Sequence, residues 1–233
     1  MSQYIGDVSL LDPKRLNRAV AASAPGSPAR AYARARLQSA EASIGTYREG
    51  PYDSKVKPAG HGFKVCYAGE GAWVCGPTQW ANFESVNGKI SAFTVGDTPI
   101  KDEVWAGHRT VVKAGRLGTV EFVSAYREDG LSLVVTVRVH SKAIALKDNL
   151  VEAQYCSPAG GKPEETAGAF RKPRGEELPI APHATTNATM FFDYRENADR
   201  HDLPCAGRGG HVVMTLESSD GSAKRTVAFK VGA

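Results

Sequence analysis

The feature that most constrains the fold is a long alternating pattern, LSLVVTVRVH, at residues 131–140. Its apolar side chains fall on one face of an extended chain, namely Leu131, Leu133, Val135, Val137 and Val139. Polar side chains such as Thr136 and Arg138 fall on the other face. Because side chains alternate with a period of two along a β-strand, this pattern predicts a strand with one buried face.

Similar runs surround this strand from about residue 100 onward. They are RTVVKAG, GTVEFVSAYR, LVEAQYC, TTNATMFFDY, HVVMTLES and AKRTVAFKV, the last two joined through the hairpin signal Asp220-Gly221. About seven alternating strands within roughly 130 residues predict an antiparallel β-sandwich over residues 100–233. The segment 157–179 is rich in proline, glycine and charge, and it reads as a surface loop.

Residues 27–99 predict a small α+β unit in which one helix lies on antiparallel hairpins. Ser27-Pro28 is a helix start, an apolar stripe at helical spacing runs from Ala29 to Ile44, and Gly45 ends it. Residues 46–62 read as a loop. Two hairpins follow, one within residues 63–75 and one around the turn signal Asn87-Gly88.

Residues 1–26 read as a basic N-terminal arm. Asp12-Pro13 predicts the start of a short helix that reaches about Ala22. Residues 1–50 hold seven lysines and arginines against four acidic residues, which is most of the net charge of +4. The plainer interpretation is a solvated helix surface, and the sharper one is a site for an anionic partner. Its candidate contacts are Arg15, Arg18, Arg30, Arg34 and Arg36.

The first two cysteines, Cys66 and Cys75, flank a turn. A two-residue loop at Glu70-Gly71 places them opposite each other on a non-hydrogen-bonded pair, where Cα atoms are about 4.5 Å apart. This separation suits a disulfide, so we expect a cross-strand bond. The alternatives are two reduced thiols that face each other and, less favoured, a zinc site, for which no second close pair of ligands is present.

The other two cysteines, Cys156 and Cys205, form a second expected disulfide, although nothing local fixes their geometry. An even count of four cysteines favours an oxidising compartment. The start of the chain, MSQYIGDVSLLDPKRL, has no signal-peptide pattern. We therefore expect either a protein kept in the cytoplasm or a mature form from which a signal was removed. No apolar run approaches the ~20 residues of a transmembrane helix, so no transmembrane segment is expected.

Signals for catalysis are weak. The six histidines form no HExxH or HxH motif, and the polar stretch from Asp199 to His211 matches no metal-site template. We expect no catalytic residue, no cofactor and no metal. The three tryptophans, Trp73, Trp80 and Trp105, fit either core packing and the domain junction or an aromatic contact surface.

The run VEFVSAY…LSLVVTVRVHSKAIAL…APHATTNATMFFDY…VVMTLES resembles the telokin-like immunoglobulin-type domains of actinobacterial secreted proteins and lipoproteins. The segment CYAGEGAWVCGPTQWANFESVNGKISAFTVGDTPI is similar to the Cys-flanked segment that often precedes that domain. The resemblance covers residues 60–231. It implies an extracytoplasmic binding or structural module without catalysis. The chain departs from the family pattern in its missing secretion signal.

These observations lead to one expected function and one alternative. We expect a non-enzymatic binding or structural module with an immunoglobulin-like sandwich, secreted or on the cell surface. Its expected partner is a protein or a larger assembly, and not a nucleic acid. The alternative is a structural component of a bacteriophage virion, such as a capsid-decorating or tail protein. Such proteins are made without a signal peptide, and a basic arm would suit docking to an acidic lattice. An enzyme is the least favoured class.

Overall fold

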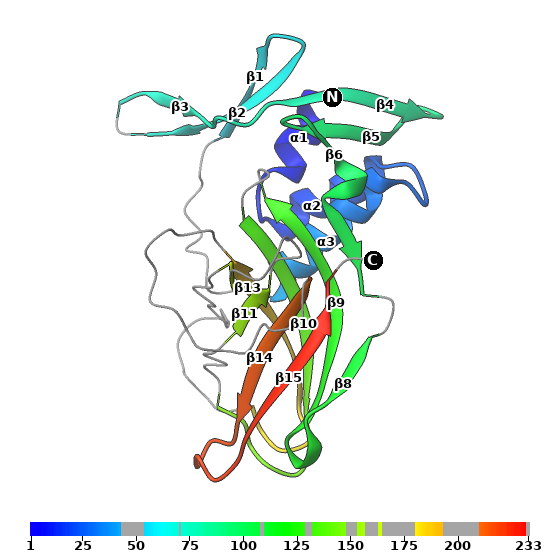
Figure 1. Cartoon of the computed structure of the whole chain (residues 1–233). Coiled ribbons are helices and arrows are strands. Elements are labelled where there is room, and N and C mark those ends of the chain that lie inside the picture. The colour runs from blue at the N-terminus through cyan, green and yellow to red at the C-terminus, as the bar shows by residue number, and fades with distance from the viewer. Residues whose placement is uncertain are drawn as a thin grey trace. The chain divides into compact units, whose positions relative to one another are not determined.

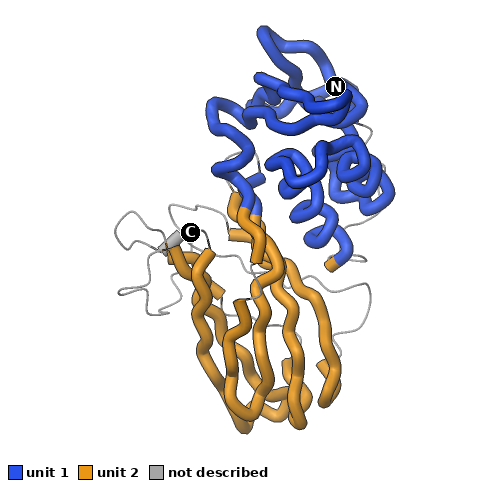
Figure 2. Tube along the Cα trace, turned by 90° about the vertical axis from the view of Figure 1, so that its right-hand side faces the viewer, with its two compact units in different colours: residues 1–41, 47–104, 126–130 blue, residues 42–46, 105–125, 131–233 orange. Residues whose placement is uncertain are grey.

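Figure 1 shows the chain as a computed structural model. The structure describes residues 1–42, 54–69, 71–107, 110–128, 132–147, 153–156, 163–164, 180–192 and 210–231. The chain divides into two compact units, coloured in Figure 2. Unit 1 comprises residues 1–41, 47–104 and 126–130, and unit 2 comprises residues 42–46, 105–125 and 131–233. We describe each unit by itself.

Unit 1 begins with three helices, α1 (Ser2–Val8), α2 (Pro13–Ala22) and α3 (Pro28–Ala42). The two predicted helix starts are confirmed. The Asp12 carboxylate accepts hydrogen bonds from the backbone N–H groups of Lys14 and Arg15, and the Ser27 hydroxyl accepts one from the N–H of Arg30. Helix α1 was not anticipated. It has seven residues and no capping side chain, so packing against α2 and β1 stabilises it rather than local signals.

A six-stranded antiparallel sheet completes unit 1, in the order β1-β2-β4-β5-β6, with β3 also paired to β2. The strands are β1 (Ser54–Ala59), β2 (Gly62–Ala68), β3 (Trp73–Cys75), β4 (Trp80–Val86), β5 (Lys89–Val95) and β6 (Thr98–Pro99), and the 3-10 turn η1 (Ile100–Asp102) follows. Both expected hairpins are present. Asn87 and Gly88 have φ values of 50° and 73°, as a tight hairpin turn requires. The loop expected over residues 46–62 is wrong for residues 54–59, which form β1.

The core of unit 1 is aromatic. The ring of Tyr32 on α3 makes edge contacts with Trp80, Phe93 and Tyr126 at centroid distances of 6.2, 5.9 and 5.6 Å. Tyr4 on α1 contacts the ring of Phe93 at 5.9 Å. Each of these rings is at least 95% buried. The helices and the sheet of unit 1 are therefore held together by one aromatic cluster, whose members come from distant parts of the sequence.

Unit 2 contains two antiparallel sheets. The first has the order β13-β10-β9-β7, with β8 also paired to β9, and the second has the order β12-β11-β14-β15. The elements are β7 (Val104–Ala106), β8 (Val111–Lys113), η2 (Gly115–Leu117), β9 (Gly118–Glu128), β10 (Ser132–Ser141), β11 (Ala153–Cys156), β12 (Pro163–Glu164), β13 (Thr185–Phe192), β14 (His211–Glu217) and β15 (Lys224–Lys230). Strands β7 and β9 each contribute residues to both units.

One hydrophobic core joins the two sheets of unit 2. The alternation predicted for β10 is confirmed in part. Leu133, Val135, Val137 and Val139 all lie in this core, but Val134 and Thr136 on the other face are buried as well, and only Arg138 and His140 on that face are exposed. Phe122 on β9 stacks on Phe229 of β15, with ring centroids 5.6 Å apart. Rings from the two sheets thus meet in a two-layer packing of the kind that the alternating strands predict. The fold is mainly β and antiparallel, and the α-helices of the described residues all lie within residues 1–42.

The predicted segments map onto these units as follows. Residues 1–26, expected as an arm, contribute α1 and α2 to unit 1. Residues 27–99, expected as an α+β unit, contribute α3 and the sheet. The chain also returns to unit 1 at Tyr126, inside the region expected to be a separate sandwich.

Candidate functional site

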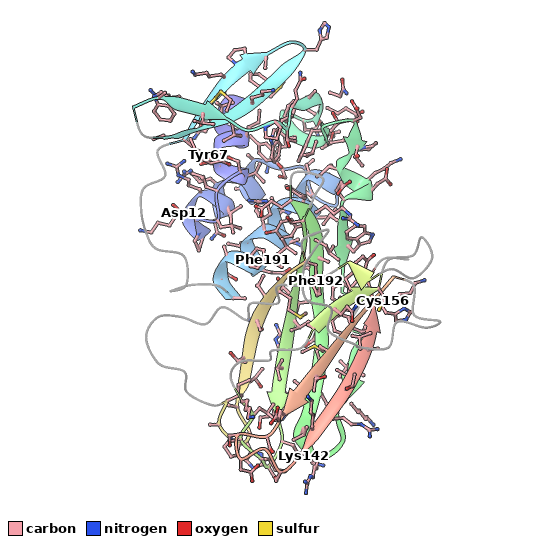
Figure 3. All side chains as sticks on the ribbon, turned by 60° about the vertical axis from the view of Figure 1, so that its left-hand side comes forward. Asp12, Tyr67, Lys142, Cys156, Phe191 and Phe192 are labelled. Atoms are coloured by element: carbon pink, nitrogen blue, oxygen red, sulfur yellow. A yellow bond between two sulfur atoms is a disulfide. The ribbon has the colours of Figure 1, made fainter. Side chains whose placement is uncertain are left out.

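A hollow of about 30 Å³, room for water alone, lies in unit 1 beside the aromatic cluster. Its lining comes from α3, from three strands and from the segments between elements, and it comprises Ser9, Arg36, Val65, Tyr67, Gly76, Thr78, Trp80 and Glu128. Tyr67 is labelled in Figure 3. Arg36 is on helix α3, and Glu128 is the last residue of strand β9. The hollow therefore depends on the return of the chain to unit 1 after residue 125.

Arg36 is the main charged group of this hollow, and only 2% of it is exposed. Its Nη2 atom lies 2.9 Å from Oε1 of Glu128 and donates a hydrogen bond of 3.2 Å to the backbone oxygen of Ser9. Its guanidinium carbon lies 5.8 Å from the ring centre of Tyr32 and 5.2 Å from that of Tyr126. The cation is thus held between two aromatic rings and a carboxylate, an arrangement that compensates a buried charge.

Burial alone would lower the pKa of the Arg36 guanidinium, but its interactions with Tyr32, Tyr126 and Glu128 outweigh burial and hold the pKa well above its usual value. Burial also raises the pKa of the Tyr126 hydroxyl, more than Arg36 lowers it. At neutral pH the site therefore contains a permanent cation and a neutral phenol. Nε of Arg36 has no hydrogen-bond partner within the described residues.

The lining of the hollow contains a single ion pair. The Glu128 carboxylate is the one acidic side chain among the eight lining residues, and Arg36 neutralises it. None of these eight residues is a histidine or a cysteine. Such a hollow can hold water against Thr78 and Trp80, and it offers no paired acid and base for proton transfer.

The five arginines proposed as anionic-partner contacts are not equivalent in the structure. Arg18 forms a two-pronged ion pair with Asp7, and Arg15 lies 3.9 Å from the carboxylate of Asp12. Arg36 is buried, and Arg30 donates to the backbone oxygen of Ser23. Arg34 is exposed and makes no ion pair with any described residue. The set therefore does not present five free cations.

The hairpin cysteines form the predicted disulfide, which is drawn in yellow in Figure 3. The register pairs Cys66 with Cys75, and the N–H of Gly69 donates to the oxygen of Ala72 next to the loop. Cys156 at the end of β11 is also disulfide-bonded. Its expected partner, Cys205, lies outside the described residues. Among the cysteines that the structure describes, none is free.

Other candidate sites receive little support from the described residues. Those residues contain no cluster of three potential metal ligands among His, Cys, Asp and Glu. Of the polar stretch considered for metal, His211 begins β14, and residues 199–205 lie outside the described part. None of the described helices combines the length and hydrophobicity that crossing a bilayer requires.

Glu128 and Tyr67 were not among the residues predicted from the sequence, and Arg36 was expected on a surface. Nothing in the sequence next to Glu128 indicates that it meets Arg36 of α3. Comparison with known proteins adds no relative: no protein-family model, no curated protein and no solved structure matches the chain.

Proposed function

We propose that this chain is a non-enzymatic binding module that works outside the cytoplasm. The observation that carries the proposal is the oxidised state of the cysteines, since Cys66, Cys75 and Cys156 are all in disulfides. Disulfides persist in oxidising compartments and are rare in the reducing cytoplasm. The neutralised hollow at Arg36 and Glu128 supports a binding role over a catalytic one.

We further propose that unit 2 is an immunoglobulin-like sandwich that serves as the scaffold. Its neighbouring strands β9, β10 and β13 take the positions of strands A, B and E of such a domain. Strands β12, β11, β14 and β15 take the positions C′, C, F and G. The order along the chain agrees with this mapping, which supports the proposed immunoglobulin-like scaffold.

Two departures separate unit 2 from antibody domains. Those domains join strands B and F by a disulfide and bury a tryptophan on strand C. Here the corresponding strands β10 and β14 carry no cysteine, and Tyr155 is the large aromatic residue on β11. Tyr155 contacts the ring of Phe192 at 6.2 Å. The proposed scaffold is therefore stabilised by apolar packing between the sheets.

Peptide mapping of the protein isolated from the cells that make it, with free thiols alkylated before denaturation, tests this proposal. We expect a cross-linked peptide pair containing Cys66 and Cys75 and no alkylated cysteine. The same sample reduced before alkylation is the control and should show four alkylated cysteines. Four alkylated cysteines without reduction would contradict the proposal and favour a protein made and assembled in the cytoplasm, such as the virion component.

A further inference from the structure

Three lysines and a tryptophan share one face of the first three strands. In the antiparallel register, Lys57 on β1 lies directly opposite Lys64 on β2, and Lys55 lies opposite Cys66. On the other edge of β2, Trp73 of β3 lies opposite Ala68. Directly opposed residues point to the same side of a sheet, and so do residues two apart. We call Lys55, Lys57, Lys64 and Trp73 the lysine face.

The lysine face points away from the helices of unit 1. The opposite side of the same strands carries Val65, which is buried and lines the hollow with Ser9. It also carries Val56, whose Cγ2 atom lies 3.6 Å from where a side chain on Gly6 of α1 would begin. Because that side packs toward α1, the lysines are on the outer side, where Lys55 and Lys57 are exposed and Lys64 is half-buried.

The lysines of the lysine face are not neutralised by the residues that the structure describes. None of its three lysines forms an ion pair with a described residue. Like charges directly opposite on neighbouring strands, such as Lys57 and Lys64, destabilise a sheet. Nζ of Lys55 lies 4.0 Å from the ring centre of Trp73, which is a cation–π contact rather than neutralisation. An anionic ligand on this face would remove the repulsion.

The face is also held in shape before any ligand binds. The Cys66–Cys75 disulfide joins β2 and β3 at the level of Lys55. The three paired strands fix the spacing of the lysines, so little backbone ordering is needed on binding. In Figure 1 the β2–β3 hairpin projects from the remainder of the sheet.

We propose that the lysine face binds a linear anionic polysaccharide. The proposal rests on the proposed binding function outside the cytoplasm and specifies the ligand of that module. Three strands are about 10 Å wide. The five residues from Lys64 to Ala68, the residue opposite Trp73, span about 13 Å along β2. A strip of this size suits one polymer chain rather than a planar membrane.

The charged groups and the sugar rings of such a polysaccharide each have a binding group on the lysine face. The lysine ammonium groups donate to carboxylate or sulfate oxygens. The indole of Trp73 offers an apolar surface to the C–H face of a sugar ring. These contacts differ from the arginine set on α2 and α3, where Arg15 and Arg18 already have carboxylate partners.

The test measures binding of a heparin octasaccharide to the whole oxidised chain by calorimetry at several salt concentrations. The test variant carries Lys55→Gln, Lys57→Gln and Lys64→Gln. The matched control carries Lys89→Gln, Lys101→Gln and Lys113→Gln, which removes the same charge from exposed lysines elsewhere. We expect the test variant to weaken binding at least about tenfold and to lower the salt slope by about two to three, with less than about twofold change in the control.

Trp73→Ala, which keeps all three lysines, should weaken binding about threefold or more, because it removes the apolar surface on which a sugar ring would pack. Circular dichroism and an intact Cys66–Cys75 bond verify that each variant folds. Equal losses in the test and control triples, or no binding at low salt, would overturn the inference. So would tighter lysine-dependent binding to an eight-base oligothymidylate or to phosphatidylglycerol vesicles. None of these outcomes alters the disulfide map, which tests the proposed function separately.

Discussion

Two arginine–glutamate pairs, one in each unit, have the same separation and different surroundings. In unit 1, Nη2 of Arg36 lies 2.9 Å from Glu128, and in unit 2, Nη1 of Arg138 lies 2.9 Å from Glu121. The glutamate side chains are 30% and 29% exposed, but the arginine side chains are 2% and 46% exposed. The difference between the pairs is therefore the burial of the cation.

This comparison shows how the two units use polar groups differently. The described core of unit 2 consists of aliphatic and aromatic residues without a charged side chain, so it holds no charge to compensate. Unit 1 places a guanidinium inside an aromatic cluster, where it needs Tyr32, Tyr126, Glu128 and Ser9 together. A buried cation adds little net stability when it is paired, and it costs much when its partners are removed.

The largest expected effect comes from breaking the two pairs in the same way. Arg36→Ala should lower the free energy of unfolding by about 3–5 kcal/mol, because it empties space between two rings and removes the partner of Glu128. Arg138→Ala should cost less than about 1 kcal/mol, as exposed pairs do. Urea titration of both variants measures the difference. Similar losses in the two variants would show that burial of Arg36 does not matter.

Substitution of two glycines should destabilise the two units separately. A side chain at Gly62 would begin 2.2 Å from the backbone oxygen of Trp80, and one at Gly118, where φ is 137°, would begin 1.9 Å from that of His140. Backbone must move in either case, so Gly62→Ala and Gly118→Ala should each cost about 2–4 kcal/mol. Hydrogen exchange should show loosening of β2–β4 in the first and of β9–β10 in the second.

Gly76→Ala is the control for these two variants, since its new methyl group would meet its nearest atom at 3.7 Å. We expect a change within about 0.5 kcal/mol. A large loss at Gly76, or loosening of the same strands by both variants, would contradict the division of the effects between the units.

Removal of the hairpin disulfide should reduce stability by an intermediate amount, and the loss should be confined to unit 1. Cys66→Ser with Cys75→Ser opens a loop with a sequence separation of nine residues, for which chain entropy predicts a loss of about 2–3 kcal/mol. The loss should be local to unit 1, with faster amide exchange in β2 and β3. Exchange in β14 and β15 is the internal reference, and equal acceleration there would refute a local effect.

The effects that are smallest at neutral pH come from two side chains with shifted pKa values. The pKa is raised for the one in unit 1 and lowered for the one in unit 2. Burial raises the pKa of Tyr4 in unit 1 to about 12, from 10.0. The folded state therefore favours neutral Tyr4, and its stability falls as pH rises from about 10 through 12. Tyr4→Phe should reduce this alkaline loss in pH-dependent unfolding curves, and unchanged curves would exclude Tyr4 as its source.

In unit 2, the Ser218 hydroxyl and the N–H of Ser222 hold the pKa of Asp220 at about 2, below the usual 3.8. The β14–β15 turn should therefore lose stability as pH falls from about 3.8 through 2. NMR titration of Asp220 checks the midpoint. Asp220→Asn should flatten the acid limb, whereas Asp97→Asn at the exposed β5–β6 turn is the control.

Much of the local structure follows from the sequence. Asp12 and Ser27 cap helices where the patterns predict them, because a cap depends on side chains within three residues. Asn87-Gly88 turns a hairpin, and Cys66 meets Cys75, because loop length sets the register of an antiparallel pair. The alternation in β10 identifies its buried face because the sheet period is fixed at two.

The rest depends on contacts that no local pattern contains. Helix α1 and strand β1 are too short or too polar to be recognised, and they stabilise each other by packing. Arg36 lies off the apolar stripe of α3 and looks like a surface residue. It is buried because the chain returns at Tyr126 and Glu128, about 90 residues later, and covers it. The lysine face likewise requires the register of three strands.

The sequence by itself thus determined the antiparallel β class, the hairpins, the helix caps and one disulfide, since each depends on neighbouring residues and a fixed repeat. The tertiary structure alone decided which arginine is buried, which residues line the hollow and which lysines share a face. Burial and charge pairing are properties of residues that meet in space, and the free energy that orders such contacts comes from the whole packed unit rather than from any segment.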